Sequence, residues 1–131
     1  MYYHLSVDGT LTVLTPKIPE CVISIYENVD TKRVCFADTI EGCLSALQDG
    51  PKDYYVYIPM MNLDDKNIYH PTVEDVRDAK YTGEIWVLDE VKVKCIGMIR
   101  CENYDWTKDH ITVNGKTTFF HYPYKWIKQN K

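Results

Sequence analysis

The chain has 131 residues, which suits one domain with a single core and is too short for two domains of ordinary size. Its formal net charge of −4 argues against bulk binding of nucleic acid, and 45% hydrophobic residues are ordinary for a globular protein. The sequence has no apolar run near the roughly 20 residues of a membrane span and no signal-peptide pattern, so we expect a cytoplasmic protein without a membrane partner.

Positive charge is concentrated at the C-terminal end. Residues 107–131 carry five lysines and one acidic residue, so residues 1–106 hold a net charge of −8 within the total of −4. Such an end is typical of a solvated tail or of a surface for an acidic partner. The five cysteines include no CxxC spacing and the four histidines are scattered, which predicts reduced thiols and no metal site.

Short extended segments and turns are predicted for the first part of the chain. Tyr2–Ser6 is a predicted strand followed by the turn signal Asp8-Gly9, and Leu11–Leu14 is a second extended segment. Residues 20–32 are predicted to form a loop with at most one helical turn.

The most consistent local pattern is a strand, Arg33–Ala37, that runs directly into a helix. Asp38 is the predicted N-cap and Glu41 its capping-box partner. The helix is expected to end near Asp49-Gly50-Pro51. Its apolar face has the spacing i, i+3, i+4, i+7 and consists of Ile40, Cys43, Leu44 and Leu47.

Strand signals dominate the second half. Asp53–Pro59 is aromatic and β-branched and predicts a strand, whereas residues 60–71 are polar and predict a loop. Thr72 is a candidate cap for a short helix. Two more strands are predicted at Glu84–Leu88 and Val91–Ile99, the second with alternating buried and wet positions.

A β-hairpin is predicted around Asn114-Gly115, between His110–Val113 and Lys116–His121. Together these elements predict the α+β class: a compact, strand-dominated single domain over residues 1–131 with one principal helix. We expect residues 1–100 to form the core and residues 101–131 to form an aromatic hairpin and a lysine-rich tail.

The order of the elements and the residues at their ends resemble a known family. The first strand carries His4 in YYHLS, the strand-to-helix junction holds Phe36 and Thr39, and a later strand opens with Glu84 in TGEIWVL. This arrangement resembles the ADP-ribosyltransferase superfamily, which includes poly-ADP-ribose polymerases, toxin transferases and a distant tRNA 2′-phosphotransferase branch. With so few arginines in the chain, that last branch is the poorer match.

The resemblance implies an ADP-ribosyltransferase-like fold, NAD as a substrate and a protein or nucleic acid as the acceptor. It implies that Glu84 and His4 are catalytic, and that His4, Ser6, Phe36 and Thr39 bind NAD. These residue types suit the chemistry, because breaking the glycosidic bond builds positive charge on the ribose, which a fixed carboxylate stabilises. A neutral histidine can hydrogen-bond a ribose hydroxyl without adding charge.

Plain structural alternatives exist for these residues. His4 can be a strand histidine satisfied by the backbone, Glu84 an exposed edge charge and Phe36 a core residue. Cys43 near a helix N-terminus would suit a cysteine hydrolase with His110 or His121 as the base. Its place on the apolar helix face favours a core role instead.

A non-catalytic interpretation is an interaction or inhibitor protein, such as one encoded by a phage or another mobile element. Its candidate surface is an aromatic cluster in the C-terminal part, which includes Tyr104, Trp106, Tyr124 and Trp126. Exposed aromatic side chains give contact area at low entropic cost. The alternative is that many of these rings pack the hairpin onto the sheet.

Overall fold

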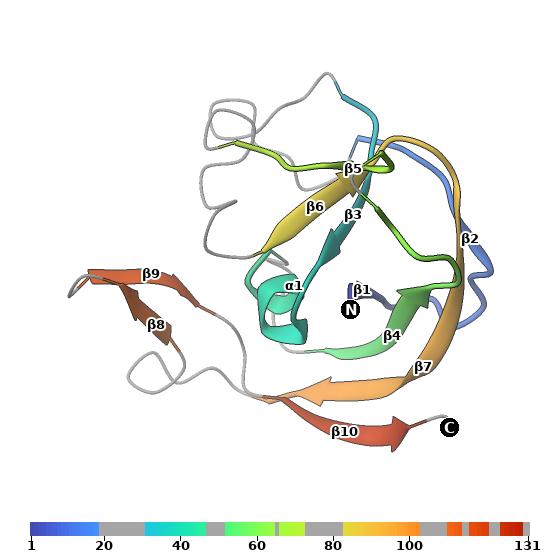
Figure 1. The fold of residues 1–131 in the computed structure, drawn as a ribbon. Helices are drawn as coiled ribbons and strands as arrows, with labels where there is room; N and C mark the ends of the chain where they lie inside the picture. Colours follow the sequence, from blue (N-terminus) through green and yellow to red (C-terminus); the bar gives the residue numbers. More distant parts are fainter. Residues whose placement is uncertain are drawn as a thin grey trace.

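The computed structural model describes residues 1–18, 31–46, 52–64, 66–72, 83–102, 110–113, 116–120 and 124–129 (Figure 1). Its elements are, in chain order, β1 (His4–Ser6), β2 (Val13–Leu14), β3 (Val34–Ala37), α1 (Ile40–Ala46), β4 (Asp53–Pro59), β5 (Ile68–Tyr69), β6 (Glu84–Val87), β7 (Val91–Cys101), β8 (His110–Val113), β9 (Lys116–Phe120) and β10 (Tyr124–Gln129). The prediction of a strand-dominated α+β domain is confirmed at this level.

Antiparallel sheets make up most of the fold. The large sheet has the order β1-β4-β7-β10, with β2 also paired to β7, and a smaller sheet has the order β3-β6-β5. Strands β8 and β9 pair only with each other in the described part of the chain. A bridge between Tyr3 and Ala37 joins the two larger sheets, because each backbone amide donates to the other residue's carbonyl.

Most of the core described by the structure lies in two clusters of buried side chains, and the fully buried Trp86, packed by Cys35, forms a third, smaller one. We call the first the helix-side cluster, because it packs under α1: Leu5, Ala37, Ile40, Cys43, Leu44, Tyr54, Val56, Ile99 and Cys101. We call the second the strand-side cluster, because it packs between the two sheets: Leu14, Val34, Phe36, Tyr57, Ile85, Val87, Val91 and Val93.

A β-bulge lets the large sheet bury opposite faces at its two ends. Val56 and Tyr57 of β4 pair with Gly97 and Cys95 of β7, which leaves Ile96 as the extra residue. Val56 lies in the helix-side cluster and Tyr57 in the strand-side cluster, and both are fully buried. Since successive strand residues point to opposite faces, α1 covers one face at one end while the small sheet covers the other face at the other end.

Gly97 is required at this bend. Its φ of 150° is rare for residues with a side chain, and a Cβ built there would lie 2.1 Å from the Lys128 carbonyl oxygen of β10. The close approach lets β10 pair with β7 from Tyr124 opposite Cys101 to Gln129 opposite Gly97. The curved β7 with β10 along its edge is visible at the bottom of Figure 1.

Two expectations about strands were wrong. Residues 60–71 were predicted to be a loop but contain β5, whose Ile68 pairs with Val87 and packs against the strand-side cluster. Residues 101–131 were predicted to be an aromatic hairpin followed by a lysine-rich tail, but their end contains β10, whose Trp126 packs against the helix-side cluster. In both cases a distant strand supplies the pairing, which local polarity does not reveal.

The predicted helix cap was wrong by one residue. The Thr39 hydroxyl accepts the Gly42 amide at 2.9 Å, so Thr39 is the N-cap rather than Asp38. The Asp38 amide still donates to the Gly83 carbonyl at 3.3 Å, which keeps Asp38 on the strand side of the turn. The predicted helix end, residues 20–30 of the loop predicted at 20–32 and the helix expected after Thr72 lie outside the described residues.

Candidate functional site

His4 is held at the start of β1 by a backbone contact. Its Nδ1 lies 2.9 Å from the Cys35 carbonyl oxygen, which can only accept, so Nδ1 carries the hydrogen and Nε2 of the neutral ring is an acceptor. Burial lowers the pKa of His4 below 6.5, the Cys35 contact opposes this shift, and the charge of Lys17 adds to it. His4 is therefore a neutral imidazole at physiological pH.

Phe36 packs against His4. The ring centroids are 6.0 Å apart at an interplanar angle of 64°, an edge contact, and Phe36 is only 2% exposed. The plain interpretation of Phe36 as a core residue is correct, since it belongs to the strand-side cluster. The same ring also forms part of the cavity described below.

Glu84 opens β6 opposite Ala37, the last residue of β3. Its Oε2 atom is buried, so Glu84 is not simply an exposed edge charge. Gly83 precedes it with a φ of 71°, and a Cβ on Gly83 would lie 1.9 Å from the Asp38 carboxylate. The turn before β6 therefore depends on glycine and brings Asp38 beside this strand.

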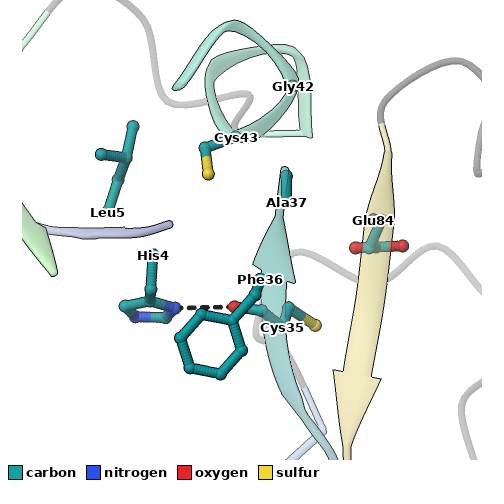
Figure 2. Close-up of a pocket in the computed structure, with 8 residues that line it drawn as sticks. All are labelled: His4, Leu5, Cys35, Phe36, Ala37, Gly42, Cys43 and Glu84. Carbon is teal, nitrogen blue, oxygen red and sulfur yellow. Dashed lines mark hydrogen bonds between the residues drawn. The ribbon is translucent and has the colours of Figure 1, made fainter. Parts of the chain in front are cut away.

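Strand pairing places Glu84 and His4 on opposite faces of the β1-β3-β6 ribbon. Tyr3, Ala37 and Glu84 form one row across the three strands, and side chains in one row share a face. His4 is the next residue after Tyr3, so its side chain points to the other face of the ribbon. There it contacts Phe36, the residue before Ala37. In Figure 2, β3 accordingly runs between His4 and Glu84.

A cavity of about 90 Å³ lies at the ends of these three strands. It is lined by His4, Leu5, Cys35, Phe36, Ala37, Gly42, Cys43 and Glu84 (Figure 2). The lining includes Ala37, the last residue of β3, and residues from both faces of the ribbon. Three of the residues named from the sequence, His4, Phe36 and Glu84, thus line one cavity.

Ser6 and Thr39, the other two predicted NAD-binding residues, are not among the residues lining this cavity. The Ser6 hydroxyl accepts the Asp8 amide at 3.1 Å, and the Thr39 hydroxyl caps α1. Leu5, Cys35 and Gly42 line it but were not named as site residues, and Cys43 was considered only as a hydrolase nucleophile. Of these residues, only Cys43 belongs to the apolar helix face seen in the sequence, and that pattern indicated a core role.

Cys43 is a residue of the helix-side cluster. Burial, before any other cause, raises the pKa of its thiol to about 12, and the charges of Glu84 and Asp38 act in the same direction. Its Sγ lies 3.2 Å from the Tyr3 carbonyl oxygen, to which the thiol donates. These observations favour the core role of Cys43 over the cysteine-hydrolase alternative, because a protonated, buried thiol is a poor nucleophile.

Tyr124 and Trp126 of the predicted aromatic surface are partly buried and pack against the helix-side cluster. The Tyr124 hydroxyl donates to Glu41 Oε1 on α1 at 2.6 Å. Tyr104 and Trp106 lie outside the described residues. In the part of the chain that is described, these rings thus fasten β10 to the body of the protein.

Within the described ranges, no group of three or more histidine, cysteine, aspartate or glutamate side chains is placed to hold a metal ion. None of the described helices has the length and apolar character needed to cross a membrane. Comparisons of the chain with protein-family models, curated proteins and solved structures found no match.

Proposed function

We propose that the chain catalyses NAD-dependent ADP-ribosyl transfer to a macromolecular acceptor, a protein or a nucleic acid, on an ADP-ribosyltransferase-like fold. The observation that carries this proposal is the common cavity of His4, Phe36 and Glu84, which come from three separate strands. The resemblance named these residues from the sequence alone.

The chemistry of the cavity suits this reaction. The bond between nicotinamide and ribose breaks with its electron pair leaving on nicotinamide, while a nucleophile of the acceptor bonds the ribose carbon and loses a proton. Positive charge builds on the ribose in the transition state, where the partly buried Glu84 carboxylate is less screened than it would be in water. His4 Nε2 accepts a hydroxyl hydrogen, because Nδ1 holds the ring in one tautomer.

The size of the cavity limits what enters it. A volume of about 90 Å³ is smaller than the roughly 150 Å³ of an engineered apolar cavity that binds benzene. A nicotinamide ring therefore needs one wall of the cavity to move, and the rest of NAD would lie outside it.

Calorimetric titration with NAD tests the proposal. Wild type should bind, and at a hundredfold excess over Kd its apparent stability should rise by about 2.7 kcal/mol. Glu84→Gln should still bind but transfer at least about 10²-fold more slowly, because it loses charge stabilisation in the transition state. His4→Ala should lose binding.

Ser6→Ala is the matched control, because Ser6 lies on the same strand as His4 but outside the cavity; its binding should match that of wild type. The proposal fails if wild type shows neither binding heat nor a stability shift at millimolar NAD. Equal loss of binding in Ser6→Ala and His4→Ala would mean that the NAD-binding site lies elsewhere on β1.

The second candidate function is a non-catalytic interaction or inhibitor protein. The observation that favours it is the exposure of large apolar side chains, with Met60 65% and Met61 47% exposed after β4 and Val13 40% exposed on β2. Exposed large apolar side chains can contribute to a contact surface when they lie together. Failure of the NAD titration would make this the leading function.

A further inference from the structure

Helix α1 forms one wall of the cavity, through Gly42 and Cys43 (Figure 2). The described part of the helix, Ile40–Ala46, has seven residues, and most of the stability of a helix in a protein comes from its tertiary packing. Its position therefore depends on what holds it: the apolar side chains Ile40 and Leu44 in the helix-side cluster, and a small set of hydrogen bonds.

Among the described residues, two side-chain hydrogen bonds tie α1 to distant parts of the chain. Cys43 donates to the Tyr3 carbonyl at 3.2 Å, a weak bond because sulfur is a poor donor. Tyr124 of β10 donates to the Glu41 carboxylate at 2.6 Å, a short bond to a charged acceptor and so the stronger tie. Burial, and after it the bond to Glu41, raises the pKa of Tyr124, so the phenol stays a donor.

We propose that α1 is a movable wall of the cavity and that the Tyr124–Glu41 hydrogen bond latches it in the closed position. Opening turns Gly42 and Cys43 away from His4 and makes room for a planar ring. For a ligand that binds only the open state, the apparent affinity is the intrinsic affinity multiplied by the fraction of molecules that are open. The latch sets that fraction and therefore the apparent affinity. The link to NAD rests on the function proposed above, whereas the movement of the wall does not.

Native-state modification of cysteines by methyl methanethiosulfonate, located by peptide mass spectrometry, tests the movement. Cys43 in the wall reacts only when α1 opens. Tyr124→Phe keeps the ring that packs on the core and removes the donor. Its Cys43 should react about tenfold faster, the factor for losing a hydrogen bond to a charged group.

Cys101 is the internal control, because it is buried in the same helix-side cluster but lies on β7. Its reaction rate should not change in Tyr124→Phe. Glu41→Gln should also raise the reaction rate of Cys43. The double variant with Tyr124→Phe should react little faster than either single variant, since both substitutions weaken the same hydrogen bond. An unchanged Cys43 rate, or an equal increase at Cys43 and Cys101, overturns the proposal.

NAD titration of Tyr124→Phe separates this proposal from the proposed function. If both hold, the affinity for NAD rises by the same factor as the Cys43 rate. If Cys43 reacts faster in Tyr124→Phe while neither protein binds NAD, the movable wall stands and the transferase function fails. If NAD binds equally to both proteins and Cys43 is unchanged, the function stands and the movable wall fails.

Discussion

His4 combines a structural and a candidate chemical role in one side chain. The contact with the Cys35 carbonyl fixes its tautomer, and the edge contact with Phe36 fixes its ring. His4 is therefore a strand histidine whose Nδ1 is satisfied by the backbone, as the plain alternative proposed. Only Nε2 is left as an acceptor, so any chemistry of His4 in the cavity passes through that atom.

The lowered pKa of His4 predicts a loss of stability in mild acid. The unfolded chain binds a proton near pH 6.5, whereas the folded chain resists it, so this contribution to stability is complete above 6.5 and declines as pH falls below it. His4→Gln should flatten this decline. The measurement is the melting temperature of both proteins from about pH 8 to about pH 5, across the range where histidine titrates. Parallel curves for the two proteins would contradict it.

At the scale of elements, α1 begins where the β3 ladder ends. The Asp38 amide donates to the Gly83 carbonyl, and in the first turn of the helix the Gly42 amide donates to the Thr39 hydroxyl. The helix thus starts one residue later than the capping-box pattern predicts, and Glu41 is left to accept from Tyr124 instead of reaching back. This shift makes the contact between α1 and β10 possible.

Thr39→Ala should destabilise the protein by about 1 kcal/mol, because the Gly42 amide loses its acceptor. Asp38→Ala is the matched control at the neighbouring position and should cost no more than about 0.5 kcal/mol, as is usual for an exposed site. Urea unfolding of the three proteins measures both. A larger loss in Asp38→Ala than in Thr39→Ala would restore Asp38 as the cap.

At the scale of the whole molecule, β10 completes the large sheet from the far end of the chain. Its Tyr124 and Trp126 pack against the helix-side cluster, while Lys125 forms an ion pair with Glu102 at 3.2 Å on the exposed side. The last described strand therefore belongs to the core domain, and residues 1–100 do not hold the whole of it.

Trp126→Ala should lower stability by about 2 kcal/mol, less than for a fully buried tryptophan because the side chain is only partly buried. Ile127→Ala, at the next and more exposed position of β10, should change stability by less than about 0.5 kcal/mol. Thermal and urea unfolding measure the difference. An unchanged stability of Trp126→Ala would mean that this ring serves a partner surface instead.

Local patterns were enough to predict several elements. Asp53–Pro59 was predicted with the bounds that β4 has, because aromatic and β-branched residues fill it without interruption. The strand at Glu84 and the strand preceding α1 were also predicted correctly. In each case the signal lies within the segment itself.

What could not be predicted depends on distant partners. The pairing of Ala37 with Glu84 and Tyr3 puts His4 and Glu84 on opposite faces, and the sequence does not show which strands will pair. The bulge at Ile96 is equally hidden, because the sequence does not show where the register of β7 against β4 shifts. Asp38 and Thr39 are both good caps, and only the contact with Gly83 decides between them.

The bulge in β7 ties the two clusters into one cooperative unit. Strands β4 and β7 each contribute to both clusters, so neither cluster persists when either strand detaches. Amide hydrogens at Val91 should then exchange with solvent only when the molecule opens as a whole. A ligand that stabilises the folded state at the cavity would slow that exchange at the far end of β7, without any change of shape between the two places.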